Sequence, residues 1–181
     1  MNAIDFVEGL KNIPSEKNIN KYKEDGLNND FIREYLESYL FKSRGGPIVS
    51  NEDPIKDLVS NYDGASVALG MVTFDIEPKE GSEYFLFGRF EGDHMVINNR
   101  TGEIEQQEYG RVNHVLSKAA QNSSRFLDAM LEAAKFLDAC GVDDDLYEDQ
   151  DAINAVAEKC SQLAGGQDYI DFYRVLLGSD L

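Results

Sequence analysis

The fold is decided by residues 83–109, EYFLFGRFEGDHMVINNRTGEIEQQEY, which read as two or three strands joined by tight turns. Residues 84–87 are a continuous aromatic and aliphatic run between Gly81 and Gly88, and this run is too short for a helix. Such a run favours a strand that is buried on both faces. Residues 95–97 form a second apolar run, so the stretch predicts paired strands.

A tight turn is predicted directly after the second run. Residues 98–102 have the sequence NNRTG, and Asn and Gly tolerate positive φ at low steric cost. Residues 103–105 then alternate between charged and apolar side chains, as a half-buried strand does. The stretch therefore predicts a β-hairpin, and it contains no recognisable catalytic group.

Helical patterns lie on both sides of this hairpin. Helical spacing of apolar residues, together with N-cap and stop residues, predicts helices at residues 2–12, 31–42, 54–61, 122–141, 152–163 and 169–177. Residues 67–77 predict the first long strand, with apolar side chains on both faces, whereas residues 15–29 predict a loop. Residues 110–121 allow either a strand or a helical turn. This order predicts an α+β fold, in which a mostly antiparallel sheet of about residues 67–109 is flanked by N-terminal and C-terminal helices.

The charge balance of the chain is strongly acidic. Its 181 residues include 17 Lys and Arg and 34 Asp and Glu, which gives a formal net charge of −17. Nucleic acid and anionic membrane surfaces are themselves negative, so the sequence disfavours both as partners. A cationic protein would instead be steered toward this chain. On its own, the acidity also fits a role in solubility alone.

The cysteines and the N-terminal residues predict a cytoplasmic location. Cys140 and Cys160 have no metal-binding spacing and suggest no disulfide framework, so we expect two reduced, partly buried thiols. Asp5 and Glu8 lie where a signal peptide needs basic residues. No apolar run approaches the roughly 20 residues of a membrane span, so we expect no membrane association.

The sequence contains no pattern typical of an enzyme or a metal site. His94 and His114 lie on different predicted elements, without a zinc-binding spacing. The acidic stretch 143–151 does not fit an EF-hand loop, because Tyr147 and Glu148 occupy the positions of a ligand and a glycine. Phosphate-binding glycine loops and nucleophile elbows are also missing from the sequence. We therefore expect no catalytic residue, no metal and no cofactor.

Five acidic residues surround the predicted hairpin. Glu91 and Asp93 precede its second strand, and Glu103, Glu105 and Glu108 follow its turn. Like charges that face each other across paired strands lower stability. The cluster fits either a solvated face of the sheet or a surface that binds Lys and Arg side chains of a partner.

Several short motifs resemble the SUKH superfamily, and they occur in that family's order over about residues 84–138. The first group is an aromatic residue and Gly that end a strand, a Gly-Asp that leads the next strand, and a Thr-Gly-Glu turn with an aliphatic residue: residues 87–88, 92–98 and 101–104. The second group is a small polar cap and a Phe-Leu pair that open the helix after the sheet: residues 122–124 and 126–127. The Gly-Pro pair at residues 46–47 is similar to one found upstream in the family.

The resemblance implies an α+β fold and a binding function. The residues of this sequence that match the family's motifs would have structural roles: Gly88, Gly92, Thr101 and Gly102. Residues 1–141 would form the SUKH-like domain, and residues 142–181 a C-terminal helical extension packed on the same domain. Bacterial members act mainly as immunity proteins, which bind and neutralise toxin domains, often nucleases, of polymorphic or contact-dependent systems. Other members are interaction modules in cell-wall regulation or protein export, and members are not typically enzymes.

Together, the residues and the resemblance predict an immunity protein. It would bind a cognate bacterial toxin domain, such as a basic nuclease, and block it sterically and electrostatically. The candidate partner-binding residues are the five acids of the hairpin: Glu91, Asp93, Glu103, Glu105 and Glu108. The alternatives are a non-catalytic regulatory or scaffolding module of the same fold, and a hydrolase that uses scattered carboxylates. We expect a monomer or a weak homodimer.

Overall fold

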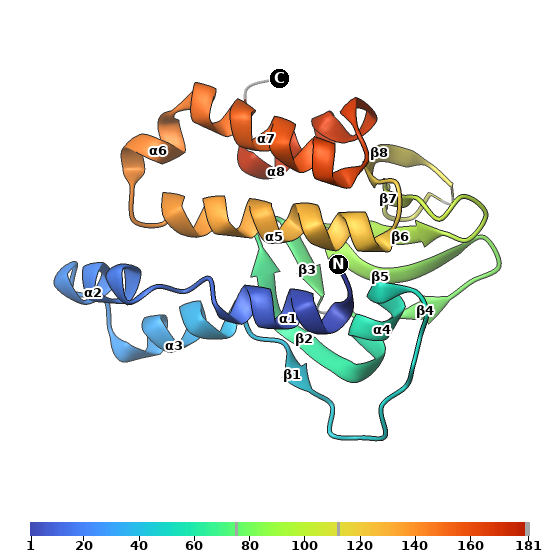
Figure 1. Cartoon of the computed structure of the whole chain (residues 1–181), viewed down its shortest axis with the longest axis horizontal. Coiled ribbons are helices and arrows are strands. Elements are labelled where there is room, and N and C mark those ends of the chain that lie inside the picture. Colours follow the sequence, from blue (N-terminus) through green and yellow to red (C-terminus); the bar gives the residue numbers. More distant parts are fainter. Residues whose placement is uncertain (75, 112, 180–181) are drawn as a thin grey trace.

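The structure, a computed structural model, describes residues 1–74, 76–111 and 113–179 of the chain. It consists of a layer of helices packed on one face of an antiparallel sheet (Figure 1). This arrangement confirms the predicted α+β class, with helices from both ends of the chain flanking the sheet.

The sheet contains eight strands within the described residues. They are β1 (Lys42–Ser43), β2 (Tyr62–Leu69), β3 (Val72–Phe74), β4 (Lys79–Glu80), β5 (Tyr84–Phe90), β6 (Asp93–Asn98), β7 (Ile104–Gln107) and β8 (Val115–Ala120). Their order across the sheet is β1-β2-β3-β5-β6-β7-β8, and β4 pairs with β5 off this path. The sheet is wider than residues 67–109, because β1, most of β2 and β8 lie outside that range. Residues 110–121, for which the sequence allows either a strand or a helical turn, contain strand β8.

Most of the helices follow a residue whose side chain caps their first turn. They are α1 (Ala3–Lys11), α2 (Glu16–Glu24), α3 (Asn29–Glu37), α4 (Pro54–Asn61), α5 (Ser123–Cys140), α6 (Asp144–Glu148), α7 (Gln150–Ala164), the 3-10 turn η1 (Gln167–Tyr169) and α8 (Ile170–Leu177). The side chains of Asn2, Ser15, Asn28, Asp53 and Asn122 each accept a hydrogen bond from a backbone N–H of the following helix. In the described ranges no helix has the length and apolar composition of a membrane span.

The loop predicted at residues 15–29 is wrong, because α2 forms there. Ser15 caps this helix by accepting a hydrogen bond from the Asn18 backbone N–H at 3.1 Å. The buried side of α2 is partly polar, and Asn18 Nδ2 donates to Asp138 Oδ2 of α5 at 2.7 Å. Helix α2 is thus stabilised by a contact with a distant part of the chain, which residues 15–29 do not reveal.

The central hairpin has the predicted strands and turn. Strand β6 pairs with β5 on one side and with β7 on the other. At the β6–β7 turn, Asn98 Oδ1 accepts from the backbone N–H groups of Arg100 and Thr101 at 3.0 and 3.2 Å. Gly102 closes the turn with a φ of 77°. The Asn and Gly of residues 98–102 therefore do what their turn chemistry predicts.

The single strand predicted at residues 67–77 is wrong. Strand β2 ends at Leu69, β3 begins at Val72, and Gly70 between them has a φ of 60°, a conformation that favours glycine. The chain turns here, so Leu69 and Val72 pair across a hairpin. Residues 67–77 show apolar side chains on both faces because the prediction treats parts of two different strands, β2 and β3, as one strand. Residue 75 of this range lies outside the described residues.

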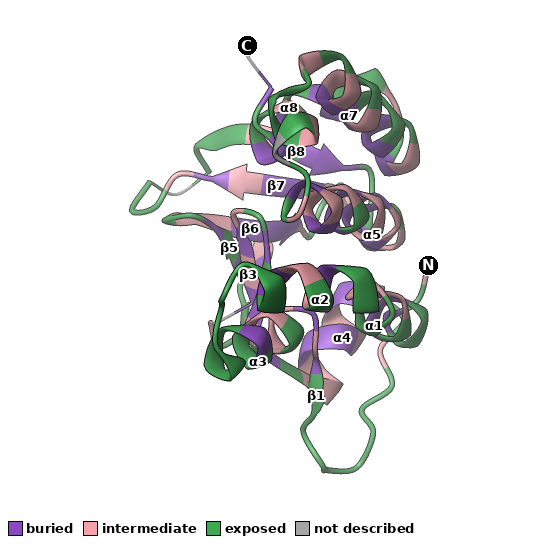
Figure 2. Cartoon of the chain, turned by 90° about the vertical axis from the view of Figure 1, so that its left-hand side faces the viewer, coloured by how far each residue is buried: buried purple, intermediate pink, exposed green. Residues whose placement is uncertain are grey.

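The core lies between the sheet and the helices. Helices α1, α4, α5 and α7 are on one side of the strands in both views of the ribbon (Figure 1 and Figure 2). The Phe126 ring of α5 lies between the rings of Phe87 in β5 and Phe172 in α8, at centroid distances of 5.8 and 6.3 Å. Burying each such ring contributes about 2 kcal/mol. Helices from residues 142–181 thus pack on the same core as the sheet, whereas the domain boundary at residue 141 stays a prediction.

Candidate functional site

A hollow lies on the sheet between β5, β6, β7, β8 and their connecting loops. Its volume is about 610 Å³. The side chains that line it are mostly polar: Ser82, Glu83, Tyr84, Asn98, Asn99, Arg100, Thr101, Glu103, Glu105, Gln107, Asn113, Val115 and Lys118. None of the described residues that line the hollow belongs to a helix. It is therefore a feature of the sheet that the helical layer leaves open.

The strand register separates the residues of the hollow from those of the core. Directly paired residues of antiparallel strands lie on the same face. Ile97 pairs with Ile104, and both belong to the core. Their chain neighbours Asn98 and Glu105 therefore lie on the other face, where they line the hollow.

Glu105 forms the buried floor of the hollow. It is only 4% exposed, and its partner on β6, Val96, is fully buried. Glu105 Oε1 accepts from Asn98 Nδ2 at 2.9 Å, and Oε2 accepts from Gln107 Nε2 at 2.9 Å. Both donors are neutral amides. Within the described residues no cationic group lies within ion-pair distance of this carboxylate, although Lys118, which is paired with Glu103, attracts it electrostatically from farther away. A buried carboxylate is costly without a cationic partner, so this position favours an incoming cation.

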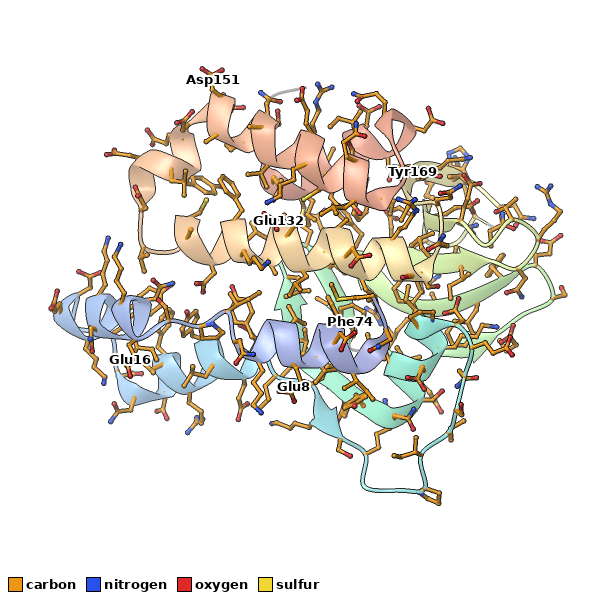
Figure 3. The ribbon with its side chains drawn as sticks, viewed as in Figure 1. Glu8, Glu16, Phe74, Glu132, Asp151 and Tyr169 are labelled. Atoms are coloured by element: carbon orange, nitrogen blue, oxygen red, sulfur yellow. The ribbon has the colours of Figure 1, made fainter. Side chains whose placement is uncertain are left out.

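Glu103 stands beside this floor and already has a cationic partner. Lys118 Nζ of β8 donates to Glu103 Oε1 and Oε2 at 2.8 and 3.0 Å. The hydrogen bond from Lys118 lowers the pKa of Glu103, and the same bond raises the pKa of Lys118. Tyr169 of η1 also donates to Glu103, at 3.3 Å, and it lies at the end of the helical layer nearest to β8 (Figure 3). This pair joins β7, β8 and the C-terminal helices at one rim of the hollow.

The opposite rim carries a third carboxylate. Glu83, which precedes β5, accepts from Asn113 Nδ2 at 2.7 Å. Asn99 donates to the Gly81 carbonyl at 2.9 Å, which holds the two connecting loops together. The rim is thus built from loop residues that are fixed by side-chain hydrogen bonds.

The five predicted acids do not form one group. The structure brings Glu103 and Glu105 together in the hollow. Asp93 lies at the other end of β6, where it accepts from Gln106 Nε2 and from the Tyr109 backbone N–H, both at 3.0 Å. Glu108 follows β7 at that same end and pairs with Arg111 and His114 at 3.2 and 3.5 Å. Glu91 is exposed on the β5–β6 turn with a φ of 52°.

Several residues of the hollow were not among the predicted site residues. The most important are Tyr84, Asn98, Gln107 and Lys118. The alternation along β7 carries part of the signal, because Glu105 and Gln107 are two residues apart and so share a face. The sequence places Asn98 in the turn and in the motif of residues 92–98, and it does not indicate that the Asn98 amide donates to Glu105. The pairing of Lys118 with Glu103 depends on β8, whose structure the sequence left open.

The other candidate groups of the sequence are explained by local packing. Within the described residues, no group of three or more His, Cys, Asp or Glu side chains could hold a metal ion. Cys140 and Cys160 are both buried and unpaired, and burial raises the pKa of the Cys160 thiol to about 12. The ring of His94 lies 5.2 Å from that of Tyr109, and its buried Nδ1 has no hydrogen-bond partner.

A second buried carboxylate, Asp138, has a structural role. Tyr35 of α3 donates to Asp138 Oδ1 at 2.7 Å, and Asn18 of α2 donates to Oδ2 at the same distance. Burial raises the pKa of Asp138. These bonds hold α2 and α3 against the C-terminal end of α5, away from the hollow in β5–β8 (Figure 1).

The hollow therefore combines an open sheet face, three carboxylates and a set of fixed amides. No family model, no curated protein and no solved structure matches the chain. The resemblance to the SUKH superfamily therefore stays a prediction from the sequence motifs of residues 84–138.

Proposed function

We propose that the protein is an immunity protein, which binds a cognate bacterial toxin domain and blocks it without chemistry. The observation that carries this proposal is the open, carboxylate-lined hollow on the sheet of a chain with a net charge of −17. The resemblance to the SUKH superfamily supports the same function. In this proposal the protein acts in the cytoplasm, as a monomer or a weak homodimer, and binds neither nucleic acid nor a membrane.

The charge of the chain favours a basic toxin, such as a nuclease. A nuclease holds phosphate with Lys and Arg side chains, so its active site attracts an acidic protein. Complementary charge accelerates association and makes it dependent on ionic strength. An inhibitor of this kind occupies the basic site and excludes the substrate, and it needs no catalytic residue of its own.

Co-expression with the toxin encoded beside the gene tests the proposal. We expect cells that produce both proteins to survive, and cells that produce the toxin alone to die. The double variant Glu103→Gln/Glu105→Gln should protect less well than the wild type. The matched control is Glu8→Gln/Glu16→Gln, which removes two charges from the exposed surface of α1 and α2. Figure 3 shows Glu8 and Glu16 on the N-terminal helices, away from Tyr169, which contacts the hollow residue Glu103.

Death of the co-expressing cells at the rate of cells with toxin alone would exclude the immunity function. The alternative is a regulatory or scaffolding module of the same fold, whose partner is not a toxin. That alternative predicts a stable complex with another cytoplasmic protein and no effect on toxin killing.

A further inference from the structure

The buried floor of the hollow is suited to one kind of cationic group. We infer that Glu105 binds the guanidinium group of an arginine side chain, which the docking protein inserts into the hollow. This inference rests on the proposed function, because that function supplies the basic partner. It goes further by naming the side chain that is recognised and the residue that recognises it.

The hydrogen bonds of Glu105 leave acceptor sites in the right arrangement. A carboxylate has about four acceptor sites, two on each oxygen. Asn98 uses one on Oε1 and Gln107 uses one on Oε2. One site therefore remains on each oxygen, which matches the two parallel N–H groups of a guanidinium fork. The ammonium group of a lysine is a point donor, so it does not present two parallel N–H groups to the two free acceptor sites.

The carboxylate of Glu105 also has no hydrogen-bonded cationic partner within the described part of the protein, and Lys118 acts on it only through longer-range electrostatic attraction. Lys118 also lines the hollow, and it pairs directly with Glu105 in the register of β7 and β8. The Nζ of Lys118, however, is hydrogen-bonded to both carboxylate oxygens of Glu103. Electrostatic attraction is stronger where water is excluded, and Glu105 is nearly inaccessible to solvent. An arginine that reaches the floor thus gains an ion pair without displacing an existing one.

The wall of the hollow can hold the flat face of a guanidinium group. Tyr84 pairs with Asn98 across β5 and β6, and both residues line the hollow. Arginine stacks on aromatic rings, so a half-buried tyrosine beside the carboxylate adds a second contact. A volume of about 610 Å³ leaves room for the side chain and for the partner backbone that carries it.

NMR titration of the isotope-labelled full chain tests the inference with blocked tripeptides as probes. The three probes are Gly-Arg-Gly, Gly-Lys-Gly and the neutral isostere Gly-citrulline-Gly. We expect the arginine peptide to shift the side-chain amide signals of Asn98 and Gln107, with a Kd on the order of 1 mM. The lysine peptide should bind about tenfold more weakly, and the citrulline peptide should not shift these signals.

Variants then assign the binding to Glu105. Glu105→Gln should lose the response to the arginine peptide, whereas Glu16→Gln, which removes a charge from α2, should keep it. The comparison of the three peptides on the wild-type protein stands even if Glu105→Gln does not fold. Equal shifts with arginine and citrulline, or arginine shifts that map outside the hollow, would overturn the inference.

The two proposals fail in different ways. Absence of arginine binding together with protection from the toxin would exclude the arginine site and leave the immunity function intact. Arginine binding in the hollow together with no protection would support the site and exclude a toxin as its partner.

Discussion

Asn98 and Glu105 are joined by a 2.9 Å hydrogen bond from Asn98 Nδ2 to Glu105 Oε1, and the same Asn98 side chain closes the β6–β7 turn through its Oδ1. One residue thus sets both the turn geometry and the orientation of the buried carboxylate. The fold of the hairpin and the shape of the hollow are coupled through this side chain.

Asn98→Ala should destabilise the protein by about 2 kcal/mol, because it removes the acceptor of the turn and leaves Glu105 with one donor. The free energy of unfolding in urea measures the change. Asn99→Ala is the control, since Asn99 is exposed and its side chain donates only to the exposed Glu80 of β4 and to the Gly81 carbonyl. We expect the control to change stability by less than about 1 kcal/mol. Equal losses in the two variants would contradict the role given to Asn98.

Gly88→Ala should destabilise the protein by about 2 kcal/mol or more. An added Cβ at Gly88 would lie 2.6 Å from the Thr73 backbone oxygen of the neighbouring strand, and a backbone atom cannot easily move away. Gly92→Ala is the matched control, because a Cβ there meets no atom within 4 Å. Thermal unfolding of both variants distinguishes a glycine required by strand packing from one that is not. Similar stability of the two variants would show that strand approach does not require Gly88.

Lys118→Gln should lower stability at neutral pH by less than about 1 kcal/mol, because the Lys118–Glu103 pair is partly exposed. The hydrogen bond from Lys118 lowers the pKa of Glu103, so its contribution is present above the ordinary value of 4.5 and is lost as the pH falls through the lowered pKa. The raised pKa of Lys118 means that the contribution also persists up to 10.5 and is lost as the pH rises through the raised pKa. Urea unfolding of variant and wild type across this range measures the difference, with the exposed Lys17→Gln as control. A difference that is independent of pH would refute this assignment.

Asp138→Asn should remove a pH dependence of stability. The sign of this dependence is opposite to that of a carboxylate in a surface ion pair, whose pKa is lowered. Burial raises the pKa of Asp138, so the folded state favours its protonated form. Stability from this site is highest below the ordinary value of 3.8 and decreases as the pH rises through the raised pKa. The variant lacks this decrease, and the difference between the two proteins should therefore grow in favour of the variant with rising pH. Asp171→Asn, an exposed change on α8, should show no such trend in the same unfolding measurements.

The sequence predicts the local parts of this fold better than the parts that depend on distant contacts. The hairpin of residues 83–109 and helix α5 are predicted because their apolar patterns and turn or cap residues lie within the segment itself. Helix α2 is missed because its polar buried residue, Asn18, is satisfied by Asp138 on α5. Strands β2 and β3 are merged because Gly70, the turn residue, interrupts an apolar run that continues on both sides.

The site is predicted only in part, for the same physical reason. Glu103 and Glu105 are recognisable as acids near a turn, but the sequence does not indicate that Glu105 is buried. Glu105 is buried because the register pairs it with Val96, and because the side-chain amides of Gln107 and Asn98 donate to its carboxylate. The register of paired strands is a relationship between segments, and no single segment contains it.

Because helices cover only one face of the sheet, neighbouring residues along a strand have different roles. Phe85 belongs to the core and its neighbour Tyr84 lines the hollow, while Ala119 is buried and its neighbour Lys118 is exposed. A substitution at an outward position such as Tyr84 or Lys118 changes the lining of the hollow and leaves the hydrophobic core as it was. If the hollow binds a partner as proposed, single amino-acid changes at such positions can therefore alter binding specificity while the hydrophobic core is preserved.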